Sequence, residues 1–244
     1  MSLKQVTISC FSNGLPEHSS NSAIVAIDVI RATTTAITAV SAGRKCYPVP
    51  TAKAALDLAV QLPDALLAGE LDGTTPDGFE ITNSPAQIAR RSDVFRPMIL
   101  LSSSGTRLIK QICDRDFSYV ACFRNYTATI EYLAEHHESV LLIGAGTRGE
   151  FREEDQMCCA WIAGGLMKRG FTAHDNLTMQ LVQRWRGAAR DAFFISRSVD
   201  YLRRSNQLQD LDFILAHFDD LDAVFKLGGQ QVEALAITEK VCGV

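Results

Sequence analysis

The stretch Ile24-Val25-Ala26-Ile27-Asp28-Val29-Ile30-Arg31-Ala32-Thr33-Thr34-Thr35 decides the fold. A short apolar run ends at Asp28, and an alanine-rich helical pattern then covers residues 32–42 and stops at a glycine. This is a strand feeding a helix, which puts Asp28 at the carboxyl end of the strand, where open α/β sheets bind their ligands. A carboxylate, a guanidinium and hydroxyls beside the free N–H groups of a helix start can hold a cation and an oxyanion. Taken alone, the same residues also suit a simple helix cap.

The composition favours a globular protein with a small ligand. The 244 residues are 47% hydrophobic and carry a formal net charge of −4, with no run of lysine or arginine. A nucleic-acid partner is therefore not expected, and an anionic ligand would need a local pocket. No apolar run approaches membrane-spanning length and residues 1–8 lack the core of a signal peptide, so we expect a cytoplasmic protein with no membrane partner. The sequence leaves room for a homo-oligomer.

The seven cysteines form no Cys-x-x-Cys pair. Their spacing fits neither a zinc ribbon nor a disulfide framework, so we expect buried reduced thiols.

Strand and helix patterns alternate along most of the chain, which predicts an α/β fold with a largely parallel sheet. One domain of residues 1–244 is expected, in which residues 172–244 could form a sub-lobe. Its helical segments at 174–186, 191–203 and 208–218 carry arginines that we interpret as solvated faces. Strands at 222–227 and 232–237, joined at Gly228-Gly229, are typical of a hairpin. A strand at 45–49, bounded by Pro48 and Pro50, is expected near a sheet edge because proline cannot donate to the ladder.

Two further strand ends carry polar residues. Gly69-Glu70 ends one strand and opens a turn-rich loop at 71–83. Loops of this length inside compact domains are more often functional or mobile than without a role. Ser102-Ser103-Ser104-Gly105-Thr106-Arg107 follows the strand at 97–101 and resembles an anion nest at a helix start, with serine-rich turn chemistry as the alternative.

A fourth strand end, Gly144-Ala145-Gly146-Thr147-Arg148-Gly149, matches the letters of a dinucleotide-binding motif. Four acids follow it, at Glu150, Glu153, Glu154 and Asp155, and they would repel a pyrophosphate at the helix start. These acids suit metal ligands better, or residues of a first helical turn that the helix dipole favours.

In a parallel sheet these four strand ends meet at one edge. Two or three carboxylates, two arginines and many hydroxyl and amide donors suit a divalent cation with a phosphate monoester, since Mg²⁺ takes oxygen ligands and usually bridges carboxylates to substrate phosphate.

These motifs also carry a family resemblance. The blocks at 27–35, 69–85, 104–107 and 146–155 resemble, in order and context, the 2-phosphosulfolactate phosphatase family. The resemblance implies a three-layer α/β/α fold and a magnesium-dependent enzyme that releases phosphate from 2-phosphosulfolactate, an intermediate on the way to coenzyme M. Ser104 stands where the family usually has asparagine, which motivates the alternative of a non-catalytic phosphate-ester-binding or regulatory protein.

We therefore expect one site, with Mg²⁺ as cofactor and a small anionic phosphate ester as substrate. The expected catalytic residues are Asp28, Arg31, Glu70, Arg107 and Arg148. Metal ligands are expected among Asp28, Glu70, Glu154 and Asp155. The expected substrate-binding residues are Thr33, Thr34, Thr35, Asn83, Ser84, Ser103, Ser104, Gly105, Thr106, Gly146 and Thr147. A haloacid-dehalogenase phosphatase would need a second aspartate where this chain has Ile30, so attack by a water is expected, with Asp28 on the metal side.

Overall fold

The computed structural model describes residues 3–11, 22–147 and 149–235. Within them, one mostly parallel sheet of ten strands has the order β4-β5-β3-β10-β9-β6-β2-β7-β1-β8. The strands are β1 (Gln5–Cys10), β2 (Ala23–Ile27), β3 (Cys46–Val49), β4 (Leu66–Gly69), β5 (Met98–Leu101), β6 (Ser118–Ala121), β7 (Ser139–Gly144), β8 (Thr172–Ala173), β9 (Val224–Gly228) and β10 (Gln231–Leu235). The predicted α/β class is confirmed.

The α-helices are α1 (Ala32–Ser41), α2 (Ala52–Gln61), α3 (Pro85–Ala89), α4 (Gly105–Ile112), α5 (Tyr126–His136), α6 (Glu153–Met167), α7 (Asn176–Trp185), α8 (Arg197–Arg204) and α9 (Leu208–Ala216). A 3₁₀ turn at Ala192–Ile195 precedes α8.

The sheet consists of two parallel blocks joined by a hairpin. Strands β4-β5-β3 are parallel to one another, as are β6-β2-β7-β1-β8. The predicted hairpin of β9 and β10 lies between the blocks, with β9 antiparallel to β6 and β10 antiparallel to β3. The last described strands therefore complete the middle of the sheet.

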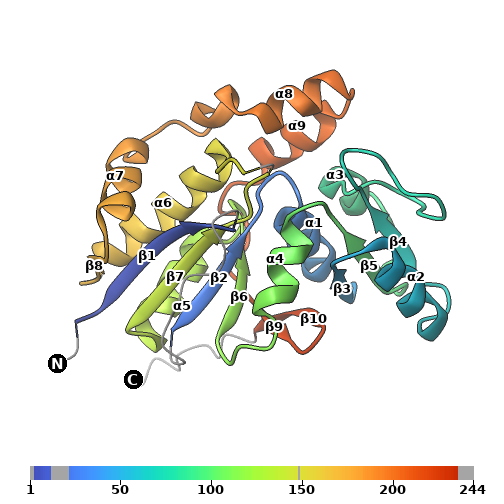
Figure 1. The fold of residues 1–244 in the computed structure, drawn as a ribbon, viewed down its shortest axis with the longest axis horizontal. Coiled ribbons are helices and arrows are strands. Elements are labelled where there is room, and N and C mark those ends of the chain that lie inside the picture. Colours follow the sequence, from blue (N-terminus) through green and yellow to red (C-terminus); the bar gives the residue numbers. More distant parts are fainter. Residues whose placement is uncertain (1–2, 12–21, 148, 236–244) are drawn as a thin grey trace, which may run out of the picture.

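Helices α1 and α4 share one core with both blocks. This cluster includes Ile24 of β2, Leu66 of β4, Met98 of β5, Ile37 of α1 and Leu108 of α4. Figure 1 shows α1 and α4 between the blocks, with α5, α6 and α7 beside the larger block. A second core joins α5, α6 and α7 to the larger block, and a third joins α2 to β3 and β5. This arrangement brings the loop after β5 close to the loop after β2.

Residues 45–49 lie near one edge of the sheet, as expected, but they do not form the edge strand. β3 lies inside the sheet, between β5 and β10. β10 pairs with β3 at Cys46, two residues before Pro48, so that ladder does not need the N–H that proline lacks.

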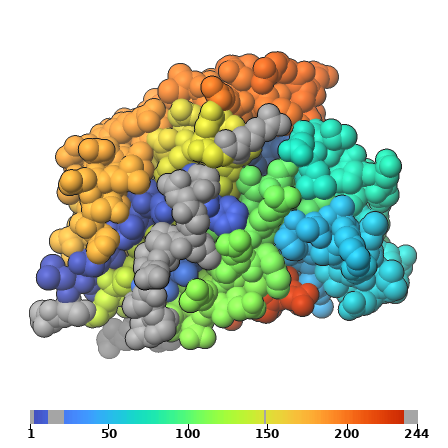
Figure 2. Space-filling view, in the orientation of Figure 1, coloured from blue at the N-terminus to red at the C-terminus, as the bar shows by residue number. Residues whose placement is uncertain are grey.

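Helices α8 and α9 run above the carboxyl ends of the central strands (Figure 1), and the orange segment containing α7 to α9 crosses the top of the molecule in Figure 2. The described cysteines, at positions 10, 46, 113, 122, 158 and 159, are buried as predicted and form no disulfide with one another, and Cys242 lies outside the described residues. In the described part of the chain, none of the helices is both long and apolar enough to cross a membrane.

Candidate active site

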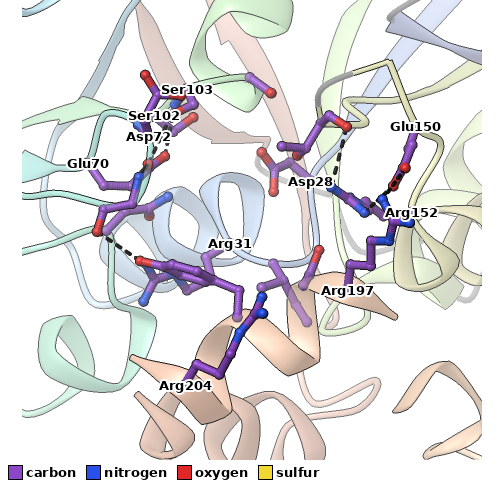
Figure 3. Close-up of a pocket in the computed structure, with 17 residues that line it drawn as sticks. Asp28, Arg31, Glu70, Asp72, Ser102, Ser103, Glu150, Arg152, Arg197 and Arg204 are labelled. Atoms are coloured by element: carbon purple, nitrogen blue, oxygen red, sulfur yellow. Dashed lines mark hydrogen bonds and ion pairs between the residues drawn. The ribbon is translucent and has the colours of Figure 1, made fainter. Parts of the chain in front are cut away.

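A cavity of about 430 Å³ lies where loops from both blocks meet α8. After β2 the chain contributes Asp28 and Arg31, and after β4 and β5 it contributes Glu70, Asn83, Ser103 and Ser104. The loop after β7 adds Thr147, Glu150 and Arg152, while α8 adds Arg197, Ser198, Tyr201 and Arg204. Figure 3 shows Glu70, Asp72 and Ser103 on one side of the cavity, and Glu150 with Arg152 on the other. The structure therefore brings the four predicted strand ends together.

Asp28 lies against the start of α4. Its side chain is buried, and Oδ1 accepts a hydrogen bond of 3.2 Å from the N–H of Ala32. A Cβ atom placed on Gly105 would lie 2.1 Å from Asp28 Oδ2, which no real contact allows. Position 105 must therefore be glycine for the first turn of α4 to approach this carboxylate.

Burial raises the pKa of Asp28 from 3.8 to about 7. The N–H of Ala32 opposes this shift, the charges of Glu70 and Glu154 add to it, and Arg31 opposes it. Carboxylates that raise one another's pKa are a hallmark of functional sites, because a cation or a proton must balance them.

Glu154 and Asp155 lie behind the cavity and do not line it. Asp155 Oδ1 accepts from the N–H of Val29 at 2.8 Å, and Oδ2 accepts from the N–H of Gly146 at 3.4 Å. Burial, followed by the charges of Asp28 and Glu154, raises the pKa of Asp155 well above its usual range. Asp155 therefore ties the loop after β2 to the loop after β7, while Glu154 Oε2 is buried without a partner among the described residues.

The predicted threonines hold the loops together and do not line the cavity. Thr33 Oγ1 donates to the carbonyl of Asp28 at 2.8 Å and accepts from the N–H of Asp28 at 3.0 Å. Thr34 Oγ1 donates to the carbonyl of Val29 at 2.8 Å. Thr35 is fully buried, with no hydroxyl partner among the described residues. Thr106 similarly bonds the backbone of Ser102. These side chains shape the loops that present Asp28 and the start of α4.

Glu70 joins two of the walls. Its Oε1 accepts from the N–H of Ser103 at 2.8 Å, and its Oε2 accepts from Gly73 N–H at 2.8 Å and from Ser103 Oγ at 2.9 Å. Ser103 Oγ accepts in turn from the N–H of Asp72 at 2.8 Å. The loop at 71–83 is therefore anchored to the β5–α4 loop through Glu70.

The arginines differ from the prediction. Arg31 lines the cavity, but Arg107 is exposed on α4 and is not among the lining residues, and Arg148 lies outside the described residues. Three arginines that we did not predict for the site line it, namely Arg152, Arg197 and Arg204. Arg197 and Arg204 are exposed, as expected for solvated arginines, but they also border the cavity, which the sequence did not predict. Arg197 and Arg204 are seven residues apart, which places both on one face of a helix. This spacing was the signal available in the sequence, but it does not reveal what that face contacts.

Asn83 and Ser84 play different parts. Asn83 lines the cavity, and its buried Oδ1 has no partner among the described residues. Ser84 caps α3 and donates to Asp210 Oδ1 at 2.5 Å, so its hydroxyl is used inside the protein. Asp210, fully buried on α9, also binds Arg31, and sequence patterns gave no sign of it.

The loop after β7 does not offer the donors of a dinucleotide site. The N–H of Gly146 points to a carboxylate, and the first turn of α6 carries three acids, Glu153, Glu154 and Asp155. A pyrophosphate here would meet negative charge, which disfavours that alternative.

The residues that line the cavity suit a divalent cation in one respect. The carboxylates of Asp28 and Glu70 provide oxygen ligands, as Mg²⁺ prefers. Among the described residues, no group of three or more His, Cys, Asp or Glu side chains is placed to hold a metal ion. A cation would therefore need oxygens from a ligand or from water as well.

This chain is similar to known proteins over most of its length. The model of the 2-phosphosulpholactate phosphatase family matches residues 10–229. A protein of Pseudothermotoga lettingae named probable 2-phosphosulfolactate phosphatase is 33% identical over 208 residues, which are 85% of this chain and 82% of the relative. A protein of the same name from Thermotoga maritima is 36% identical over 59% of this chain and 61% of the relative. Another, from Caldanaerobacter subterraneus, is 27% identical over 84% of this chain and 87% of the relative.

The four strand ends that form the cavity lie within the matched residues. This chain belongs to the 2-phosphosulfolactate phosphatase family.

Proposed function

We propose that this chain is a magnesium-dependent phosphatase that hydrolyses 2-phosphosulfolactate to sulfolactate and phosphate. The observation that carries the proposal is one cavity, in a member of this family, that combines the carboxylates of Asp28 and Glu70 with several arginines. The relatives are named as probable phosphatases of this substrate, which supports the choice of ester.

The metal would be held by Asp28 and Glu70, together with phosphate oxygens of the substrate and water. Mg²⁺ commonly binds through one or two carboxylates plus substrate phosphate, so two acids on the cavity wall are sufficient. The side-chain carbonyl oxygen of Asn83, which has no partner among the described residues, would be a further oxygen ligand on the same wall. When bound, the ion would polarise the phosphoryl oxygens and orient the nucleophile.

The start of α4 and Arg31 supply donors for the phosphate. The N–H groups of Ser104 and Gly105 have no acceptor among the described residues, and a helix start favours an anion. Arg31 presents a guanidinium that a buried carboxylate already orients. During hydrolysis a water oxygen bonds to phosphorus, the ester P–O bond breaks and the leaving alkoxide takes a proton that the attacking water gives up. These donors would stabilise the charge that develops on the phosphoryl oxygens.

Hydrolysis assays test this function. Purified protein should release phosphate from 2-phosphosulfolactate with Mg²⁺ and lose this activity in EDTA. Asp28→Asn should abolish release while the circular dichroism spectrum stays unchanged, whereas Asp200→Asn, at an exposed pair with Arg203, should behave as wild type. Near-normal turnover by Asp28→Asn would contradict the assignment. Tight binding of phosphate esters without hydrolysis of any would instead support a non-catalytic binding protein.

A further inference from the structure

The side of α8 that borders the cavity is basic. Arg197 and Arg204 both line the cavity. A separation of seven residues places two side chains within about 20° of each other around a helix and roughly 10 Å apart along it. Tyr201, on the turn between them, lines the cavity as well. One face of α8 therefore forms a wall of the cavity.

Two contacts, one at the start and one in the middle of this wall, hold α8 in place. Tyr201 Oη donates to the carbonyl of Gly73 at 2.9 Å, and Arg197 pairs with Glu150 of the loop after β7. Gly73 has a φ of +85°, and a Cβ there would lie 2.9 Å from the Tyr201 ring, so this approach requires glycine. The basic face is thus fixed relative to the loops that follow β4 and β7.

Arg204 differs from the other arginines of the cavity. Arg31 pairs with Asp210, and Arg152 and Arg197 both pair with Glu150. Arg204 makes no hydrogen bond or ion pair within residues 3–11, 22–147 and 149–235. Its charge is therefore uncompensated beside the cavity, and Figure 3 shows it extending from α8 into the space between the two sides.

The opposite wall is acidic. Asp28, Glu70 and Asp72 come from the loops after β2 and β4. In the proposed function, Asp28 and Glu70 of this wall bind the metal, and the metal binds the phosphate. The cavity, at about 430 Å³, is larger than a phosphate group needs, so the rest of the substrate would extend toward α8.

We propose that Arg204 forms a second anion subsite that binds a carboxylate or sulfonate of a substrate whose phosphate lies beside Asp28. This inference rests on the proposed phosphatase function. It makes Arg204 a specificity determinant for the acid groups that the substrate carries beside its phosphate. A guanidinium matches the planar or trigonal oxygens of such groups.

Three esters of graded charge test the subsite. 2-Phosphosulfolactate carries a carboxylate and a sulfonate, 2-phospholactate keeps the carboxylate alone, and isopropyl phosphate has neither. Arg204→Gln should lower kcat/KM for 2-phosphosulfolactate about tenfold or more, mainly through KM, because a charge-assisted hydrogen bond is lost. Hydrolysis of isopropyl phosphate should not change. The effect on 2-phospholactate identifies the group that Arg204 binds: a similar loss indicates the carboxylate, and no loss indicates the sulfonate.

The matched control is Arg203→Gln. Arg203 is the preceding residue of α8 and is exposed, but it pairs with Asp200 and does not line the cavity. This variant should match wild type with all three esters. An equal loss in both variants would overturn the subsite, as would an equal loss with all three esters in Arg204→Gln.

Failure of the proposed function gives a different result. If wild type hydrolyses none of the three esters, the phosphatase assignment fails, and calorimetric binding of 2-phosphosulfolactate decides the subsite. Weaker binding by Arg204→Gln than by Arg203→Gln then supports it, whereas equal affinities or no binding overturn it.

Discussion

Asp210 Oδ2 lies 2.6 Å from Arg31 Nη1, and both side chains are almost entirely buried. Through its other oxygen, Asp210 accepts from Ser84 Oγ and from the N–H of Ala86. One carboxylate on α9 therefore connects the loop after β2 with the start of α3 and fixes the position of Arg31 at the cavity.

Asp210→Asn should lower the free energy of unfolding by about 3 kcal/mol, because it leaves the buried Arg31 charge without its partner. Urea denaturation measures this loss. Asp200→Asn is the control, since the exposed pair of Asp200 with Arg203 should contribute less than about 1 kcal/mol. Equal losses of unfolding free energy in the two variants would show that the buried pair stabilises the fold no more than the exposed pair does.

Gly105→Ala should reduce kcat for phosphate release about 100-fold, since a displacement of about 1 Å at a reacting group is sufficient for such a loss. The added Cβ would meet both Asp28 Oδ2 and, at 2.6 Å, the Cβ of Ala32, so the carboxylate must move. Steady-state kinetics measures the effect. In Gly164→Ala of α6 the new Cβ makes an ordinary contact of 3.6 Å with Val182, so its kinetics should stay at the wild-type level.

The metal-free protein should lose stability as the pH rises from 4.5 to 8. The pKa of Asp28 is about 7 in the folded chain and 3.8 ordinarily, so between these values the folded state holds a proton that the unfolded state has released. A state that binds more protons is favoured at low pH, and the gain disappears as the pH passes the folded pKa. The raised pKa of Asp155 acts in the same direction.

Asp28→Asn removes the Asp28 part of this dependence. The free energy of unfolding should therefore fall less in this variant than in wild type over the same pH range. The difference between the two falls should be on the order of 3 kcal/mol. Urea titrations in EDTA at pH 4.5 and 8 measure the difference. Parallel pH profiles for the two proteins would rule out Asp28 as the source.

Magnesium together with inorganic phosphate should raise the Tm of wild type. A ligand at a hundredfold excess over its Kd adds about 2.7 kcal/mol to the stability of the folded state. Differential scanning fluorimetry should show this shift in wild type and little of it in Asp28→Asn or Glu70→Gln, which lack one proposed metal ligand. A full shift in both variants would place the metal elsewhere.

The sequence by itself determined the order of strands and helices, the hairpin at Gly228-Gly229 and the four polar strand ends. These features depend on local patterns: apolar runs, capping residues and turn residues act over a few positions. The sequence did not show that β3 is an inner strand, because its neighbour β10 follows it by about 180 positions in the chain.

Only the tertiary structure decided which polar side chains face the cavity. Thr33 and Thr34, in the first turn of α1, closely follow Asp28, yet their hydroxyls bond the backbone of the preceding loop, while Arg107 lies on the exposed side of α4. Arg204 and Asp210 come from helices far along the chain and reach the site because α8 and α9 pack over the strand ends. The direction of a side chain depends on such long-range packing, and residue type and spacing alone do not contain it.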